Sequence, residues 1–241
     1  MQETSALVSA ELASIVDRFP DLSTSLVATA CQRFNIGLRV APAGVRPLRA
    51  NQRLIGRAIP VRYYGSIDVV LEALEHSNPG DVLVIDNKGR LYEACIDHLT
   101  VLEATSAGIK GAVVWGVHRE TEKVSFLDFA LFSYGSFPRE TLQLRQAPTD
   151  ALAAARIGIA TVTRDDVVVA DSDGVLFVPY SRLGDVLDAA RSIATSQREQ
   201  AALVRQGSSL RQQFRFRQYL TIRLEDPAYT LRKHLRAVND V

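Results

Sequence analysis

The chain has few cysteines, almost no net charge and no long apolar run. Its 241 residues include two cysteines, Cys31 and Cys95, which are too few and too far apart for a disulfide framework or a metal knuckle. We therefore predict two reduced, buried thiols. The 28 basic and 27 acidic side chains leave a formal charge of +1, so overall charge gives no reason to expect nucleic acid or an anionic membrane as a partner.

Membrane signals are also missing from the sequence. No apolar run approaches the roughly 18 residues that would span a bilayer. The N-terminus leads into an amphipathic helix expected over residues 6–18, without the cationic start and apolar block of a signal peptide. We therefore expect a cytoplasmic protein with no membrane partner. A hydrophobic content of 47% is enough for one substantial core.

The residues after this helix predict a second helix and then a strand. Ser23 or Thr24 can cap a helix that runs to about Phe34, because their hydroxyls accept hydrogen bonds from first-turn amides. Glycine and proline break the chain over residues 36–47, which indicates a loop or an edge strand. Apolar alternation over residues 54–63 then favours a strand.

The central block begins with a turn at residues 78–81, Asn-Pro-Gly-Asp. It leads into Val-Leu-Val-Ile at residues 82–85, a run typical of a strand covered on both faces. The polar sequence Asp-Asn-Lys-Gly at residues 86–89 is expected to end this strand.

A helix and a second strand are expected next. Residues 91–107 are good helix formers, and Gly108 lies where a left-handed residue commonly ends a helix. Residues 111–116, Gly-Ala-Val-Val-Trp-Gly, predict another buried strand. Strand, helix and strand in this order indicate a βαβ unit in an α/β fold. The loop at residues 116–122 would then follow the carboxyl end of a parallel strand, where such sheets tend to bind ligands.

The last third predicts strands followed by a long helix. Residues 157–162 and 166–170 are expected to be strands, and the acidic turn at 171–174 joins the latter to a strand at 175–178. That turn lacks the further acidic positions of a calcium loop, so we interpret it as a hairpin turn. A long amphipathic helix is expected over residues 182–206.

Two separated motifs carry a family resemblance. They read Pro79-Gly-Asp-Val-Leu-Val-Ile-Asp86 with Gly108-x-x-Gly111-x-Val-Val-x-Gly116-x-x-Arg119-Glu120, and Asp165-Asp-Val-Val-Val-Ala-Asp-Ser-Asp-Gly-Val-Leu-Phe-Val-Pro179. With Gly135 and Pro138 they cover roughly residues 22–190, and this region resembles the RraA-like family of ribonuclease E regulators and 4-hydroxy-4-methyl-2-oxoglutarate aldolases, also called oxaloacetate decarboxylases. The resemblance implies a compact swivelling-type α/β domain, assembled as a homotrimer or homohexamer with sites between subunits.

The resemblance also implies functions for Arg119 and Glu120. In aldolase members an arginine at the first position binds the pyruvyl part of the substrate, and an aspartate at the second holds a divalent metal through a water-rich shell. A guanidinium can grip a carboxylate with two parallel hydrogen bonds, and a single carboxylate suits Mg²⁺ or Mn²⁺. Glu120 keeps the charge of the aspartate and adds a methylene. We expect His118, on the opposite side of an extended segment, to be structural.

A second part of the site is implied at the start of the preceding helix. Family members typically have glycine followed by an acid there, and their backbone amides face the substrate carboxylate. The matching residues here are Asp97, His98, Leu99 and Thr100, so both signature positions differ. An aspartate at the glycine position occurs among regulator-type members. His98 could donate a proton or orient the metal's waters, since an unperturbed histidine titrates near neutrality, or it could simply cap or pack.

The C-terminal residues form a basic segment with interleaved aromatics. We assign residues 1–195 to the α/β domain and residues 196–241 to a helical arm. Basic and aromatic groups could bind RNA, but the helical spacing favours an arm that packs on a neighbouring subunit. Nucleic acid is therefore not among the partners that we expect from the sequence.

Two functions remain open from the sequence. The first is a metal-dependent lyase that cleaves a small pyruvyl oxoacid through a metal-stabilised pyruvate enolate, with Arg119, Glu120 and His98 as catalytic residues. The second is a non-catalytic regulator or ribonuclease-binding protein with the same fold. Arg119 and the acidic Glu120 favour the first function, whereas Asp97, His98 and the basic arm favour the second.

Overall fold

The computed structural model describes residues 22–141, 145 and 148–239, so the helix expected over residues 6–18 lies outside the described part. The chain divides into two compact units, residues 1–191 and 192–241. Within the described residues, no helix has both the length and the apolar character that crossing a membrane requires.

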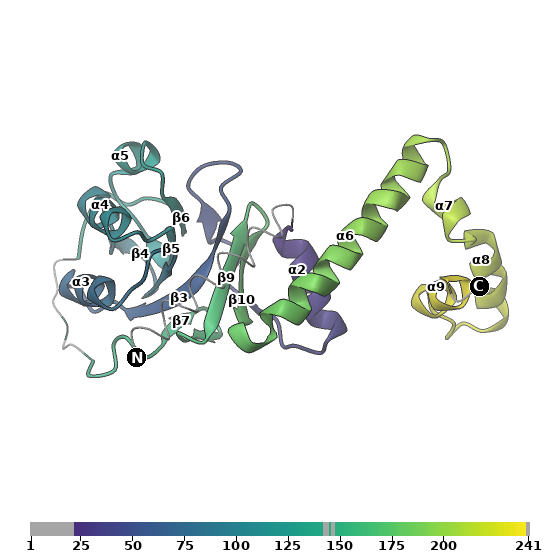
Figure 1. Cartoon of the computed structure of the whole chain (residues 1–241), viewed down its shortest axis with the longest axis horizontal. Coiled ribbons are helices and arrows are strands. Elements are labelled where there is room, and N and C mark those ends of the chain that lie inside the picture. The colour runs from purple at the N-terminus through teal and green to yellow at the C-terminus, as the bar shows by residue number, and fades with distance from the viewer. Residues whose placement is uncertain (1–21, 142–144, 146–147, 240–241) are drawn as a thin grey trace. The chain divides into compact units, whose positions relative to one another are not determined.

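The first unit is built on an eight-stranded mixed sheet with the strand order β1-β10-β9-β3-β4-β5-β6-β2 (Figure 1). Pairing is parallel between β3, β4, β5 and β6 and antiparallel elsewhere. The strands are β1 (Arg39–Val40), β2 (Arg46–Pro47), β3 (Leu54–Arg62), β4 (Val82–Ala94), β5 (Gly111–Val117), β6 (Ala130–Ser133), β9 (Asp166–Asp171) and β10 (Gly174–Pro179). A separate antiparallel pair is formed by β7 (Ala155–Ile157) and β8 (Ala160–Val162).

Helices and two apolar layers complete this unit. The helices are α2 (Thr24–Arg33), α3 (Asp68–Glu75), α4 (His98–Ser106), α5 (Thr121–Ser125), a 3-10 turn (Tyr180–Arg182) and α6 (Leu183–Arg205), which continues into the second unit. Residues that alternate along β3, β4 and β5 supply opposite cores. Leu83 and Ile85 pack on the side of α3 and α4 (Figure 1), whereas Val82 and Val84 pack with β7 and β8. Both faces of the parallel strands are therefore covered, as their continuous apolar runs predict.

Many local predictions are confirmed. Ser23 caps α2, and its side chain accepts a hydrogen bond from the Leu26 amide at 3.4 Å. The strand, helix and parallel strand of the expected βαβ unit are β4, α4 and β5, and Gly108 takes the left-handed φ of +80° after α4. The acidic hairpin turn joins β9 to β10. Cys31 and Cys95 are free and buried.

Three boundaries were predicted wrongly. Residues 86–89 do not end the strand: the left-handed Lys88 and Gly89 (φ 56° and 67°) form an irregularity, after which β4 continues to Ala94. As a result α4 begins at His98 rather than near residue 91. Residues 157–162 do not form one strand either, because Gly158 (φ 63°) turns the chain between β7 and β8.

The second unit contains the end of α6 and three short helices, α7 (Leu210–Gln213), α8 (Phe216–Glu225) and α9 (Leu231–Asn239). An aromatic cluster holds α8 to α9. The Tyr219 ring lies 5.7 Å from the His234 ring and 6.2 Å from the Tyr229 ring, and Tyr219 and His234 are buried. His234 Nε2 also lies 2.9 Å from the Phe214 carbonyl oxygen. The aromatics of the arm therefore pack largely against one another.

Candidate functional site

The predicted loop lies at the carboxyl end of β5, beside the start of α4. The Arg119 N–H donates to the Ile96 carbonyl at 3.1 Å, which ties the loop to the segment that leads into the helix. Gly116 allows this end of β5 to lie close to β4, because a Cβ there would be 2.9 Å from the Asn87 Cβ. The fold thus places side chains from residues 97–100 and 119–120 around one point.

Arg119 binds two carboxylates. Its Nη2 lies 2.8 Å from Asp97 Oδ2 and 2.9 Å from Glu140 Oε2. The Asp97 hydrogen bond, helped by the charge of both acids, raises the pKa of Arg119 above its usual value against the opposing effect of burial. The guanidinium side chain is 29% exposed, so solvent still reaches it. The carboxylate-binding chemistry expected of this residue is therefore present, but its partners are the chain's own acids.

Asp97 is the N-cap of α4. Its Oδ1 accepts from the Thr100 N–H at 3.0 Å and from the Thr100 hydroxyl at 2.8 Å, while Oδ2 faces Arg119. Burial alone would raise the pKa of Asp97, but the hydrogen bonds from Thr100 and Arg119 outweigh it and hold that pKa below its usual range. Asp97 therefore joins the arginine to the N-terminal end of the helix.

Glu120 occupies a left-handed conformation, with φ 56° and ψ 41°. A long side chain adopts this region rarely, so the position is a candidate for a functional constraint. Its Oε2 accepts from the His98 backbone N–H at 3.3 Å, and Oε1 lies 2.7 Å from Lys123 Nζ. The Lys123 hydrogen bond is the main cause that holds the pKa of Glu120 below its usual value.

Two amides of the first turn of α4 are thus already bonded to protein carboxylates, His98 to Glu120 and Thr100 to Asp97. Leu99 lies in the same turn with its side chain exposed. Helix N-termini leave such amides without partners inside the helix, and they favour anions. The structure therefore brings all the predicted site residues together, with carboxylates at the amides.

His118 lies in the interior rather than in the site. Its ring nitrogens lie 2.8 Å from the Ser133 hydroxyl and 3.0 Å from the Thr121 hydroxyl. Burial lowers the pKa of His118, so the neutral imidazole is favoured. Its contacts join β6 to the start of α5, in keeping with the structural role expected from the sequence.

The sequence reasoning missed two residues that contact the site, Glu140 and Lys123. Glu140 pairs with Ala94 in a parallel bridge and so comes beside Arg119 only through the fold. Lys123 gave a local signal, because an acid and a base three residues apart are neighbours on a helix surface.

A divalent metal would depend on Glu120. Among the described residues, no group of three or more His, Cys, Asp or Glu side chains could surround a metal ion. Mg²⁺ keeps several waters and commonly uses one or two carboxylates, so a single carboxylate fits it. The ion pair with the exposed Lys123 is weak enough in solvent for a metal to replace it. The residues therefore fit a water-rich Mg²⁺ or Mn²⁺ site and not an all-protein cage.

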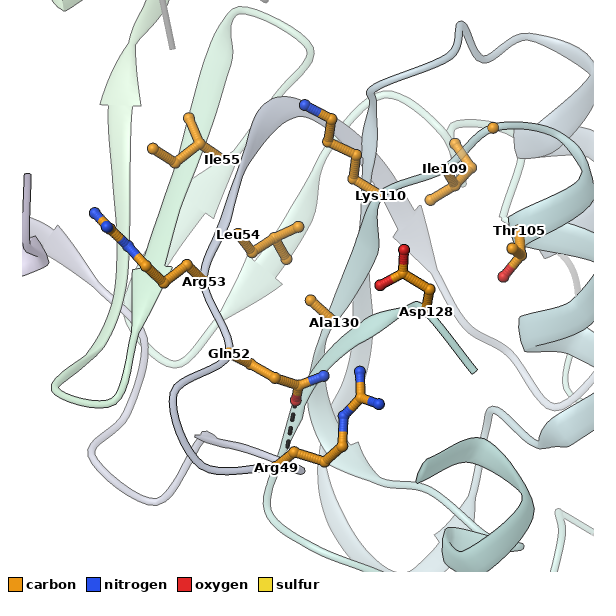
Figure 2. A pocket seen from close by; sticks show the side chains of 11 residues that line it. Arg49, Gln52, Arg53, Leu54, Ile55, Thr105, Ile109, Lys110, Asp128 and Ala130 are labelled. Atoms are coloured by element: carbon orange, nitrogen blue, oxygen red, sulfur yellow. Dashed lines mark hydrogen bonds between the residues drawn. The ribbon is translucent and has the colours of Figure 1, made fainter. Parts of the chain in front are cut away.

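A pocket elsewhere in the first unit is separate from this site (Figure 2). It has a volume of about 620 Å³, lies where β3, β5 and β6 begin, and includes Arg49, Gln52, Lys110 and Asp128. Arg49 donates to the Ser125 carbonyl at 2.8 Å and Gln52 to the Phe129 carbonyl at 3.0 Å, so both hold the neighbouring loop. None of the predicted site residues lines it.

Comparisons with known proteins agree on one family. A candidate 4-hydroxy-4-methyl-2-oxoglutarate aldolase of Halalkalibacterium halodurans is 27% identical over 188 residues, 73% of this chain and 81% of that protein. An uncharacterised protein from Pseudomonas syringae superposes with a TM-score of 0.71 at 26% identity, covering 83% of this chain and 96% of the other. Streptomyces coelicolor RraAS2, titled an unusual member of the RNase ES inhibitor RraA family, gives a TM-score of 0.68 at 25% identity over 81% and 98%.

A family model described as RraA-like, Aldolase/RraA, matches residues 13–177, which is more than half of the chain. The mixed α/β sheet described above is the fold that these structural neighbours share. The helical unit at residues 192–241 lies beyond the matched residues. By sequence and by fold, this chain belongs to the RraA-like family.

Proposed function

We propose that the chain is a divalent-metal-dependent lyase that cleaves a pyruvyl oxoacid, of the type that splits 4-hydroxy-4-methyl-2-oxoglutarate or decarboxylates oxaloacetate. The observation that carries the proposal is the convergence of Arg119, Glu120 and the first turn of α4 at the carboxyl end of β5. Arg119 and the helix amides hold carboxylates already, so their geometry suits a substrate carboxylate.

Each residue has a proposed role in that reaction. Arg119 would bind the substrate carboxylate and stabilise negative charge as the carbon-carbon bond breaks. The backbone amides from His98 to Thr100 would orient the same carboxylate. His98 is the proposed donor of the proton that converts the pyruvate enolate to pyruvate. Glu120 would hold Mg²⁺ or Mn²⁺, which supplies Lewis-acid stabilisation of the enolate when bound.

The test is turnover of both substrates by the purified chain, followed as pyruvate formed. We expect activity with Mg²⁺ or Mn²⁺ and its loss on adding chelator. Oxalate resembles the enolate, so calorimetry should also detect oxalate binding with the metal and not with chelator. Equal oxalate binding in both conditions would remove the metal from the proposal.

A second function is favoured by one specific observation. The Asp97 carboxylate already occupies Arg119 and the Thr100 amide, which a substrate carboxylate would need. A chain in which this contact persists would be a non-catalytic regulator, such as a ribonuclease-binding protein. Absence of turnover with both substrates and both metals, in the native chain and after replacement of Asp97, would favour this function over the lyase.

A further inference from the structure

The charge of the chain is concentrated in its C-terminal unit. Residues 192–241 contain nine basic and four acidic side chains, a formal charge of +5, so residues 1–191 carry −4 of the total of +1. Eight of the nine basic residues are arginines. Near-neutral overall charge therefore conceals a small, strongly basic unit, which is the electrostatic character of a polyanion-binding surface.

The basic side chains of this unit differ in what they contact. Arg223 lies over the Tyr219 ring at 5.3 Å and Lys233 over the Tyr229 ring at 5.3 Å, so both are used within the unit. Between residues 192 and 239, by contrast, the structure gives Arg211, Arg215 and Arg217 no acidic partner, and all three are exposed. Three neighbouring arginines are thus available to an external anion.

These three arginines line one groove between α7 and α8. The groove has a volume of about 1050 Å³, and its other walls include Gln212, Gln218 and Phe216. No acidic residue lines it. Guanidinium groups suit phosphates because their donors match phosphate oxygens in pairs. The amides add groups that can bond to ribose hydroxyls, and the Phe216 edge of the groove can contact a base.

We propose that the unit formed by residues 192–241 binds single-stranded RNA in the groove between α7 and α8. A concave surface receives a strand, whereas reading a duplex through its major groove requires a projecting helix or ribbon. Tyr219 and His234 are buried inside the unit, so contacts to phosphate dominate and binding should depend little on base sequence. This reverses the partner expected from overall charge and does not rest on the lyase activity.

The test is fluorescence anisotropy of the full chain with a labelled oligouridine. The triple variant Arg211→Gln, Arg215→Gln, Arg217→Gln should bind at least about tenfold more weakly. Its plot of log affinity against log salt should be shallower by about 2, because each phosphate contact to a single strand contributes about 0.7. A charge-matched control, Arg33→Gln, Lys88→Gln, Lys110→Gln, removes three exposed cations from the first unit and should bind within about twofold of the native chain.

Three further measurements separate this proposal from others. Binding of the native chain that is undetectable at about 50 mM salt would overturn it. Displacement of the RNA by polyglutamate at equal charge concentration would indicate an acidic protein surface instead, and equal affinity for oligodeoxythymidine would overturn the assignment to RNA. Melting curves of both triple variants show whether the helices remain folded, and the salt dependence of the native chain tests the proposal without any substitution.

Discussion

At the residue scale, Asp97 decides whether the site is open to a substrate. Its carboxylate bonds to the Thr100 amide through one oxygen and to Arg119 through the other, the two contacts that a substrate carboxylate would make. Aldolase members resembled by this sequence have glycine here, which leaves both groups available. One side chain can therefore account for a switch between a lyase and a regulator on the same fold.

Replacing Asp97 by glycine should open the site. Freeing Arg119 removes a competing charge-assisted hydrogen bond of about 1.5–3 kcal/mol, so we expect kcat/KM for oxaloacetate to rise at least about tenfold. Glycine is tolerated at an N-cap and costs a few tenths of a kcal/mol, so the melting temperature should change little. Asp97→Asn is the matched control, because it keeps the cap and weakens the ion pair. A lower kcat/KM in Asp97→Gly at unchanged melting temperature would make Asp97 part of the catalytic machinery.

Replacing Arg119 by lysine tests the guanidinium itself. Lysine keeps the charge beside Asp97 and Glu140 but loses the planar donor pair, so we expect kcat/KM to fall about 30-fold, or about 2 kcal/mol of transition-state stabilisation. Arg139→Lys, a change at an exposed neighbour, should leave turnover and melting temperature unaltered. Native turnover in Arg119→Lys would exclude this loop as the active site.

At the element scale, the loop after β5 is held in place by a buried histidine. His118 connects Ser133 at the end of β6 to Thr121 at the start of α5, and Arg119 and Glu120 lie between these anchors. Because the His118 ring is buried and neutral, the position of the two site residues depends on a polar contact inside the protein.

This contact should make stability depend on pH. The folded state lowers the pKa of His118, whereas the unfolded chain titrates near the usual value of about 6.5. Protons therefore bind preferentially to the unfolded state below that pH, and the melting temperature should fall as pH drops from about 7.5 to about 5. His118→Gln should melt lower at pH 7.5 and show a smaller pH dependence. An unchanged slope would mean that another group causes the loss of stability in acid.

At the scale of the whole molecule, the two units have different chemical characters. The first buries an apolar core on both faces of its parallel strands, and the second is a basic group of helices around an aromatic cluster. An arm that docks on another subunit through its aromatics was one expectation from sequence. Because Tyr219 and His234 are already buried within the unit, the aromatics alone do not require such docking.

We nevertheless expect a closed homotrimer or homohexamer, because the family resemblance places sites between subunits. Light scattering coupled to size exclusion gives the mass directly, and a trimer of this 26.5 kDa chain would have about three times that mass. A monomer at micromolar concentration would contradict a site shared between subunits, although the Asp97 and Arg119 substitutions would still test the site within one chain.

The sequence by itself determined the local elements and the identity of the site. The cap at Ser23, the apolar run that begins β4 and the glycine after α4 depend on neighbouring residues, so their patterns are legible in one dimension. The motif ending in Arg119 and Glu120 likewise identified the loop, and the structure brings it beside the residues expected at the start of α4.

Only the tertiary structure decided how those groups pair. Lys88 and Gly89 end a strand by composition, yet pairing with β5 carries β4 on to Ala94, because the partner strand satisfies its backbone hydrogen bonds. The same extension brings Glu140 to Arg119, a contact that no local pattern encodes. Asp97 reads as a helix cap in the sequence, and the fold gives its second oxygen to Arg119, since side chains distant in sequence meet only when strand register is fixed.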